Sequence, residues 1–304
     1  MTNEALPAVL RFAFVAVLGA PNVGKSTLIN RIVGTKVSIV SPKVQTTRTR
    51  VIGIAIQSQS QIVFIDTPGV FEPRRRLDRA MVAAAWTGVA DADRICLLVD
   101  AARGIDGNTN SIIEKLTKEG RPVDLVLNKI DLVKKPLLLE LTEALSRDAL
   151  FENIFMISAA HGDGVNDLMA HLAETAPDGP WMFPEDQISD MPERQLAAEI
   201  TREKLYLQLR QELPYAATVE TETWTDMDNG SAHIEQVIYV QRDTQKAIIL
   251  GKHGARIKSI GADARVELEK LLERRVHLFL FVKVRSNWGD DPDRYRSWGL
   301  DFNA

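Results

Sequence analysis

The sequence predicts an α/β fold with a mostly parallel six-stranded sheet, followed by a smaller α+β domain. Between residues 12 and 175, short apolar runs alternate with stretches of helical periodicity. This alternation is typical of strand–helix–strand units, which form parallel sheets. Residues 176–184 then interrupt the pattern with three prolines and a glycine, and the order of elements changes after them.

The first domain is expected to contain six strands, at residues 12–18, 50–56, 61–66, 94–100, 124–128 and 153–157. Helices are expected between them, at residues 25–33, 80–89, 111–119, 137–145 and 166–176. Ligands of such sheets bind at the carboxyl ends of the strands. The functional motifs are therefore expected there.

The second domain is expected to follow the order α-β-β-α-α-β, with elements at residues 193–211, 216–225, 232–241, 244–250, 256–274 and 276–285. In the last strand, Phe279 and Phe281 alternate with an apolar core face. We expect helices to cover these rings, in preference to a role in base stacking. The predicted boundaries are 1–178 for the first domain, 179–194 for a linker, 195–285 for the second domain and 286–304 for a tail packed on it.

Composition excludes several classes of protein. The 304 residues are 45% hydrophobic and 26% charged, with a net charge of −4, as in soluble globular proteins. A single cysteine rules out a disulfide framework and suits a reducing compartment. The apolar run at 12–20 is expected to be a buried strand, not a secretory signal. No run approaches the roughly 18–20 apolar residues that span a bilayer.

The segment Gly19-Ala-Pro-Asn-Val-Gly-Lys-Ser26 matches a phosphate-binding loop and lies between a predicted strand and a predicted helix. Glycines let backbone N–H groups point at phosphates, Lys25 reaches the β- and γ-phosphates, and the Ser26 hydroxyl ligates Mg²⁺. A chance match is expected in roughly one sequence in a hundred. The predicted phosphate-binding residues are Gly19, Ala20, Pro21, Asn22, Val23, Gly24, Lys25, Ser26 and Thr27.

A second motif, Asp66-Thr-Pro-Gly69, ends a predicted strand forty residues further on. Asp66 can hold the Mg²⁺ shell through water, and the Gly69 N–H can sense a γ-phosphate. Alone, these residues would read as an ordinary turn. The predicted contacts of this motif are Asp66, Thr67, Pro68, Gly69 and Val70.

The third motif, Asn128-Lys-Ile-Asp131, selects the base. One carboxylate, that of Asp131, can accept both the N1–H and the 2-amino group of guanine, and adenine has no such pair. Asn128 is expected at N7, with the Lys129 stem along the ring. Ser158-Ala159 follows the last strand and would add an N–H to O6. The predicted base-binding residues are Asn128, Lys129, Ile130, Asp131, Ser158, Ala159 and Ala160.

Residues 36–50 form the expected effector loop, in which Val44-Gln-Thr-Thr-Arg48 carries the candidate metal-binding threonine. We predict Thr47, immediately before Arg48, in preference to Thr46. The alternative is a solvated polar loop with no such role. The predicted metal ligands are thus Ser26, Thr47 and, through water, Asp66.

Catalysis is assigned to Lys25, Thr47 and Gly69. Many nucleotide hydrolases of this kind place a glutamine after the Asp-x-x-Gly turn to orient water, but here that position is Val70. Slow intrinsic hydrolysis is therefore expected. Asn22 either helps to hold K⁺ against the phosphates or only shapes the turn.

In the second domain, Gly251-Lys-His-Gly254 lies between two predicted helices. Such Gly-x-x-Gly loops clamp single-stranded RNA in KH domains, although the bare motif is weak. Residues 241–285 hold eleven Lys and Arg against five Asp and Glu, the surface charge that phosphate contacts need. A basic face on a protein-binding domain is the alternative. The predicted RNA-binding residues are Ile249, Gly251, Lys252, His253, Gly254, Arg256 and Lys258.

The nucleotide motifs resemble those of regulatory GTPases, and the α-β-β-α-α-β order resembles a type II KH domain. With Gln45–Arg48, Glu199–Lys204 and Glu212–Tyr215, the whole chain resembles the Era family of ribosome-assembly GTPases. The resemblance implies a cytoplasmic monomer that binds GTP or GDP with Mg²⁺, and K⁺ is a further candidate cofactor.

The resemblance also implies binding to the 3′ end of 16S rRNA during 30S subunit assembly, under control of the nucleotide, and peripheral contact with the inner membrane. A GTP-dependent, membrane-associated cell-cycle regulator or scaffold, whose second domain binds protein, is the alternative.

Overall fold

The computed structural model describes residues 9–43, 46–146, 150–209 and 213–304, which form two compact units. The first unit runs to Ser38, resumes from Thr47 to Asp190, and also contains Trp298–Ala304. The second unit contains Ile39–Thr46 and Met191–Ser297. The expected linker, residues 179–194, thus falls largely within the first unit.

A six-stranded sheet forms the centre of the first unit, in the order β2-β3-β1-β4-β5-β6. Only β2 and β3 pair in antiparallel fashion; the other pairs are parallel, which brings the carboxyl ends of five strands to one edge. The strands are β1 (Arg11–Leu18), β2 (Val51–Gln57), β3 (Ser60–Asp66), β4 (Arg94–Asp100), β5 (Val123–Asn128) and β6 (Phe151–Ile157).

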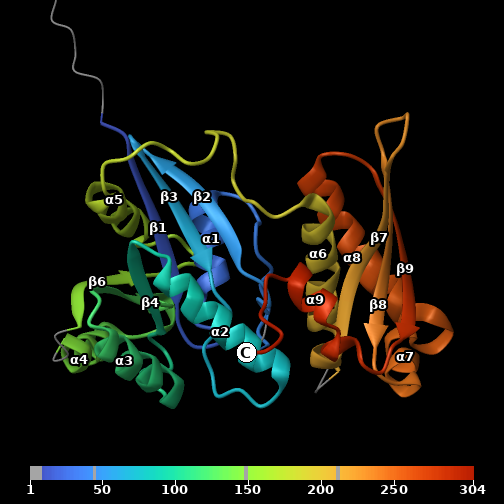
Figure 1. The fold of residues 1–304 in the computed structure, drawn as a ribbon, viewed down its shortest axis with the longest axis horizontal. Helices are drawn as coiled ribbons and strands as arrows, with labels where there is room; N and C mark the ends of the chain where they lie inside the picture. The colour runs from blue at the N-terminus through green and yellow to red at the C-terminus, as the bar shows by residue number, and fades with distance from the viewer. Residues whose placement is uncertain (1–8, 44–45, 147–149, 210–212) are drawn as a thin grey trace, which may run out of the picture. The chain divides into compact units, whose positions relative to one another are not determined.

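Helices cover both faces of this sheet (Figure 1). They are α1 (Lys25–Val33), α2 (Arg76–Ala90), α3 (Gly107–Glu119), α4 (Lys135–Ser146) and α5 (Val165–Thr175), with a short 3₁₀ turn at Ile130–Leu132. One apolar core lies between the sheet and α1 and α5, and another between the sheet and α2, α3 and α4. The central strands β1, β3, β4 and β5 are largely buried on both faces, so they read as continuous apolar runs. Cys96 lies among these buried residues as a free thiol.

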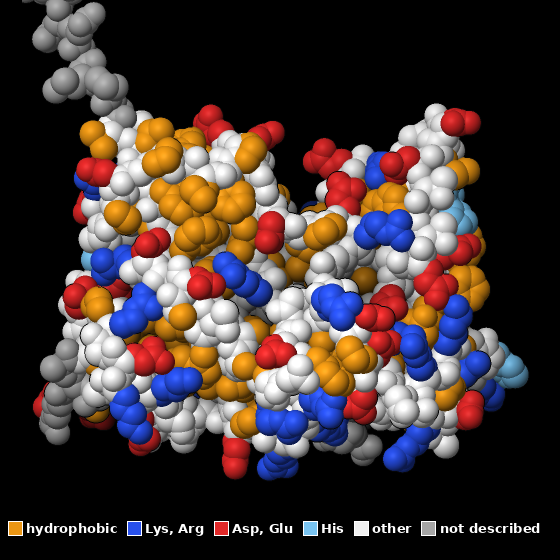
Figure 2. All heavy atoms as spheres, in the orientation of Figure 1, with side chains coloured by type: hydrophobic (Ala, Val, Ile, Leu, Met, Phe, Trp, Pro, Cys, Tyr) orange, Lys and Arg blue, Asp and Glu red, His pale blue; other side chains and the backbone are white. Residues whose placement is uncertain are grey.

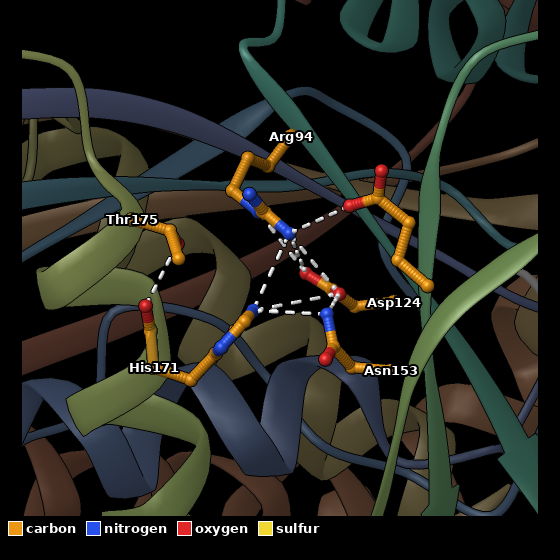
Figure 3. Close-up of polar contacts among 6 residues, drawn as sticks. Arg94, Asp124, Asn153, His171 and Thr175 are labelled. Atoms are coloured by element: carbon orange, nitrogen blue, oxygen red, sulfur yellow. Dashed lines mark hydrogen bonds and ion pairs between the residues drawn. The ribbon is translucent and has the colours of Figure 1, made fainter.

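A polar cluster joins the opposite, amino-terminal ends of β4, β5 and β6 (Figure 3). Asp124, whose side chain is 1% exposed, accepts hydrogen bonds from Arg94 at 3.0 and 3.1 Å and from Asn153 at 2.8 Å. His171 of α5 lies 3.3 Å from both Arg94 and Asn153. These contacts satisfy a buried carboxylate far from the carboxyl ends of the strands.

Residues 177–190 lie along the first unit. The Gly179 N–H donates to the Leu10 carbonyl at 2.9 Å, and the Trp181 indole donates to the Gln59 carbonyl at 3.2 Å. The Ile54 N–H donates to the Ile188 carbonyl at 2.9 Å. The proline-rich segment is therefore held by backbone hydrogen bonds of the first unit.

The second unit has the predicted α-β-β-α-α-β order around a three-stranded sheet, β7-β8-β9. The strand β8 is antiparallel to β7 and parallel to β9. The elements of the second unit are α6 (Glu193–Gln208), β7 (Ala217–Asp226), β8 (Ala232–Val240), α7 (Asp243–Leu250), α8 (Ala255–Leu272), β9 (Val276–Val284) and α9 (Pro292–Ser297). It also contains 3₁₀ turns at Pro214–Ala216, Lys252–Gly254 and Trp288–Asp290. Residues 210–211 of the expected first helix lie outside the described residues.

Helices α6, α7 and α8 cover one face of this sheet, where Val276 and Val282 of β9 are buried. On the other face, Phe279 and Phe281 are 46% and 47% exposed. The expectation that helices cover these two rings is therefore wrong, because all three packed helices lie on the opposite face. His233 of β8 stacks on Phe279, with ring centres 4.9 Å apart.

No helix in the described parts of the chain has the length and apolar character needed to cross a bilayer.

Candidate nucleotide site and RNA-binding loop

The loop from Gly19 to Ser26 connects β1 to α1, and its backbone is tightly enclosed. Gly24 has a left-handed φ of 104°, and a Cβ atom there would lie 2.2 Å from the Asn128 Nδ2 atom. A Cβ atom at Gly19 would lie 2.5 Å from the Leu98 carbonyl oxygen. Both positions therefore require glycine, because neither neighbouring atom belongs to the mobile end of a long side chain that could move aside.

Lys25 is buried in this loop, with 6% of its surface exposed. Its ammonium group donates to the carbonyls of Gly19 and Ala20 at 3.1 and 3.2 Å. Burial lowers the pKa of Lys25 to about 8, although the nearby Asp66 carboxylate acts in the opposite direction. A bound phosphate would favour the charged form of this side chain.

The side-chain oxygen atoms of three candidate metal-binding residues lie close together beside Lys25. The Ser26 hydroxyl donates to Asp66 Oδ2 at 2.8 Å, and the Thr47 Oγ1 atom lies 3.0 Å from Ser26 Oγ. Neighbouring ligands of an octahedral Mg²⁺ ion, each about 2.1 Å from the metal, stand about 3 Å apart. Asp66 Oδ1 is buried and accepts no hydrogen bond from any described residue. These groups fit a hydrated Mg²⁺ ion.

The two candidate threonines point to different partners. Thr47 Oγ1 lies 3.3 Å from Asp66 Oδ2, whereas the Thr46 hydroxyl donates to the Lys43 carbonyl at 2.7 Å. This geometry agrees with the choice of Thr47, and the assignment as a ligand stays a prediction. Val44 and Gln45 of the same predicted loop lie outside the described residues.

The turn after β3 lies against the phosphate-binding loop. The Val70 N–H donates to the Gly19 carbonyl at 3.2 Å, and the Thr67 hydroxyl donates to the Val17 carbonyl at 2.8 Å. A Cβ atom at Gly69 would lie 2.9 Å from the Pro21 Cα atom. The Val70 side chain is buried in the core between the sheet and α2, where it offers no group that could polarise water.

The candidate base-binding residues form a connected polar network. The Asn128 amide donates to the Val23 carbonyl at 2.7 Å, and its Oδ1 atom accepts from the Ala159 N–H at 2.9 Å. Asp131 accepts a hydrogen bond from the Ser158 hydroxyl at 2.6 Å. Thus the segment after β6, predicted only from its position, is joined directly to the motif after β5.

Lys129 has two partners, the Asn22 carbonyl at 2.8 Å and Asp100 Oδ2 at 2.6 Å. Asp100 was not among the predicted site residues, and neither was Ser38, whose hydroxyl donates to Asp66 Oδ2 at 2.6 Å. The position of Asp100 at the end of β4 was a usable signal, since the other motifs follow strand ends. Ser38 carries no such signal.

The loop Gly251–Gly254 joins α7 to α8 with an unusual backbone. Gly251 has φ 72° and ψ 177°, and His253 has a left-handed φ of 51°. A Cβ atom at Gly251 would lie 2.8 Å from the Arg256 side chain. Lys252, His253, Arg256 and Lys258 are exposed, and basic side chains stand around α7 in Figure 2.

Ile249 differs from the other predicted RNA-binding residues, because it is fully buried in the core of the second unit. Its side chain supports α7 from inside, whereas the neighbouring Ile248 is 47% exposed.

Two family models match the chain, one for each unit. The model described as 50S ribosome-binding GTPase matches residues 14–129. The model described as KH domain matches residues 212–289. The two matches agree with the predicted fold of each unit.

Similar proteins cover nearly the whole chain. The GTPase Era of Rhizobium meliloti (strain 1021) is 62% identical over 96% of this chain and 93% of that protein. The GTPase Era of Agrobacterium fabrum is 60% identical over 99% and 94% of the two chains. The chain belongs to the Era family of GTPases. The resemblance inferred from its motifs is therefore confirmed.

Solved Era structures have the same fold. A crystal structure of Era in complex with MgGDPNP and nucleotides 1506–1542 of 16S ribosomal RNA is 40% identical, with a TM-score of 0.90, over 95% of this chain and 99% of that chain. A variant of Aquifex aeolicus Era bound to GDP·AlF4⁻ is 39% identical with the same TM-score and coverage. The Era-family fold, a GTPase domain followed by a KH domain, is thus confirmed.

Proposed function

We propose that this Era-family GTPase uses its nucleotide state to control binding of its second unit to the 3′ end of 16S rRNA, during maturation of the 30S subunit. The observation that carries the proposal is the exposed cationic loop Gly251–Gly254 in a KH domain. A solved relative of the same fold holds both a GTP analogue and 16S rRNA nucleotides.

In the first unit, Lys25 and the loop backbone would bind the phosphates, and Asp131 would accept the two guanine donors. Ser26 and Thr47 would ligate Mg²⁺, and Asp66 would hold its water shell. The metal supplies positive charge where the transferred phosphoryl group carries negative charge. Thr47 is expected to do so only with a γ-phosphate present, so it would report which nucleotide is bound.

Hydrolysis is proposed to be slow, because the buried Val70 side chain replaces the residue that commonly orients water. Water would instead be positioned by the Gly69 backbone and the Thr47 segment. The partly buried Asn22, with φ 66° in the phosphate-binding loop, would add a neutral carboxamide oxygen that suits K⁺.

The K⁺ proposal is tested by turnover in K⁺ and in Na⁺ at equal ionic strength. Faster hydrolysis in K⁺, lost in Asn22→Ala, is the expected result. Equal rates in the two salts would remove K⁺ from the mechanism.

The RNA proposal is tested with Lys252→Asp/His253→Asp. Aspartate tolerates the left-handed conformation of His253, so the loop should keep its shape. Affinity for a single-stranded 16S 3′-end RNA should fall at least about tenfold at 0.1 M salt, because the changes remove phosphate-neutralising charge. Lys118→Asp, at an exposed site on α3, is the matched control for the first change. Unchanged RNA affinity in the double variant would favour a protein-binding scaffold.

The family relationship also leads us to propose a cytoplasmic monomer with peripheral contact to the inner membrane. Flotation with vesicles of inner-membrane lipid composition tests this contact. Absence of the protein from the vesicle fraction in both GTP-analogue and GDP states would remove it.

A further inference from the structure

Residues 39–46, here named the effector segment, belong to a different unit from their chain neighbours. Ser38 and Thr47 are part of the first unit, whereas Ile39–Thr46 is part of the second. Besides hydrogen bonds within the segment, its described residues, 39–43 and 46, make hydrogen bonds with α6 and the residue that follows it. Two neighbours of Asp66 in the candidate nucleotide site, Ser38 and Thr47, are thus separated in the sequence by a segment that packs with the second unit.

Among the described residues, three side chains make four hydrogen bonds between the effector segment and the end of α6 or the residue after it. The Val40 N–H donates to Glu203 Oε1 at 2.8 Å. The Lys43 ammonium donates to the carbonyls of Tyr206 and Leu209, at the carboxyl end of α6. The Arg202 guanidinium donates to the Thr46 carbonyl.

The side chains that make or support these contacts lie on one face of α6. Glu199, Arg202, Glu203 and Tyr206 are spaced three, four and seven positions from the first, which places them in neighbouring turns on the same side. Arg202 and Glu203 are only 1% and 3% exposed. Charged side chains are rarely buried to this extent unless they are paired.

Arg202 is paired and oriented within this face. Its Nε atom donates to Glu199 Oε1 at 2.8 Å, and its guanidinium carbon lies 5.1 Å from the centre of the Tyr206 ring. Burial alone would lower the pKa of Arg202, but Glu199 more than offsets this and raises it. The result is a permanently charged, rigidly held donor aimed at one carbonyl.

That carbonyl belongs to the peptide group that joins Thr46 to Thr47. Because a peptide group is planar, the Thr46 oxygen, the Thr47 nitrogen and the Thr47 Cα atom move together. The Thr47 hydroxyl lies 3.0 Å from the Ser26 hydroxyl in the first unit. A contact with α6 on one side of this peptide thus restrains a candidate metal ligand on the other side.

We propose that Arg202 is a positioning residue for GTP hydrolysis, which holds the Thr46–Thr47 peptide so that the Thr47 hydroxyl faces Ser26 and Asp66. By linkage, GTP that draws Thr47 into the site also stabilises the effector segment on α6. The inference rests on the proposed roles of Ser26, Thr47 and Asp66. It assigns to named atoms the route by which the nucleotide and the KH domain affect each other.

Arg202→Met tests this inference in the full-length protein, because methionine keeps the apolar stem and removes the donor. The single-turnover rate of GTP hydrolysis should fall about tenfold, the equivalent of one charge-assisted hydrogen bond. Affinity for a GTP analogue should fall, and affinity for GDP should not change. In the nucleotide-free protein, the Val40 amide should exchange its hydrogen faster than in the wild type.

Arg194→Met is the matched control. Arg194 is on the same helix but donates to the carbonyls of Thr221 and Glu222, so its replacement should leave the hydrolysis rate, both nucleotide affinities and the amide exchange at wild-type values. Lys43→Met offers a second route if Arg202→Met fails to fold, because Lys43 belongs to the effector segment and not to the helix. It should reproduce the loss of GTP preference.

Wild-type hydrolysis and wild-type GTP preference in both Arg202→Met and Lys43→Met would overturn the inference. Equal losses of GTP and GDP affinity would also overturn it, because they indicate a merely structural role. RNA affinity of the wild-type protein distinguishes the two proposals. If the wild type does not bind the 16S 3′-end RNA, the proposed function fails, while the nucleotide measurements still decide the role of Arg202.

Discussion

Asp131 illustrates how much chemistry one side chain can decide. Its carboxylate accepts from the Ser158 hydroxyl, which orients it at the mouth of the candidate base site. In Asp131→Asn, an amide replaces one acceptor oxygen with a donor. The N1–H and 2-amino donors of guanine then face the N–H donor of the amide, so one hydrogen bond is lost. Xanthine has a carbonyl in place of the 2-amino group, and this carbonyl can accept a hydrogen bond from the amide.

We expect Asp131→Asn to lower GTP affinity at least about a hundredfold, since mismatched buried polar groups each cost about 1–3 kcal/mol. Affinity for xanthosine triphosphate should rise. Competition binding with the two nucleotides measures both changes, and retained GTP affinity would refute the assignment of Asp131 to the base.

The protonation of Lys25 should make nucleotide binding depend on pH. Burial lowers the pKa of Lys25 to about 8. Nucleotide phosphates favour the charged form, so the pKa is higher in the complex. Well below pH 8 the lysine is charged in both states, and binding needs no proton. Above pH 8 it is neutral before binding, and binding must take up a proton.

We therefore expect GDP affinity to fall as the pH rises above about 8. At pH 8, about half a proton should be taken up per GDP bound, with much less uptake at pH 7. Calorimetry in buffers of different ionisation enthalpy measures this uptake. Equal uptake at the two pH values would show that Lys25 is charged before the nucleotide arrives.

Among elements, β4, β5 and β6 carry function at one end and stability at the other. Asp100 and Asn128 end β4 and β5 at the candidate nucleotide site. Near the amino ends of the same strands, Arg94 and Asn153 hold the buried Asp124 carboxylate (Figure 3). The two ends should thus respond separately to mutation.

Arg94→Met should lower the free energy of unfolding by about 3–5 kcal/mol, because it leaves a buried carboxylate without its main cation. Arg94→Met/Asp124→Asn should recover part of this loss, since the unpaired charge is then absent. Denaturant unfolding measures both variants. The GDP affinity of the folded protein should match that of the wild type, and a clear loss would mean that the two strand ends are coupled.

Strand β9 shows where periodicity stops being informative. Alternation separates Val276 and Val282 from Phe279 and Phe281, but it does not say whether a second layer covers the other face. That depends on how many helices the domain has and where they pack. Arg294 of α9, 4.3 Å from the centre of the Tyr239 ring, covers only part of that face.

At the scale of the whole molecule, the chain does not divide into consecutive domains. Residues 298–304 follow α9 of the second unit, yet they are part of the first. Leu300 is 6% exposed, and the Phe302 ring centre lies 4.3 Å from the Arg76 guanidinium of α2. The predicted tail, 286–304, therefore contributes to both units.

Leu300→Ala should destabilise the first unit by about 2–3 kcal/mol, because it removes a buried leucine side chain. Thermal unfolding with and without GDP identifies the transition of that unit, since GDP raises the midpoint of the unit that binds it. Leu139→Ala makes the same chemical change at a side chain 66% exposed and should cost less than about 0.5 kcal/mol. Equal effects of the two changes would contradict the structural role of Leu300.

Local patterns were sufficient to predict most of the fold. Apolar runs and helical periodicity located all six strands of the first sheet and the α-β-β-α-α-β order of the second unit. This is possible because a buried strand or helix face produces a pattern of apolar residues within a short stretch of sequence. The glycines of the phosphate-binding loop and of Gly251–Gly254 were likewise visible, since their backbone conformations admit few other residues.

Contacts between distant parts of the chain required the three-dimensional structure. The hydrogen bond from Ser38 to Asp66 joins residues 28 positions apart, and the one from Arg202 to the Thr46 carbonyl joins residues 156 apart. Leu300 belongs to the first unit although the second unit precedes it in the chain. No local pattern encodes such pairs, because each partner has an ordinary setting in its own segment. The motif predicts that Thr47 is poised to sense a nucleotide, and the fold places the carbonyl of the preceding residue against the buried Arg202 of the second unit.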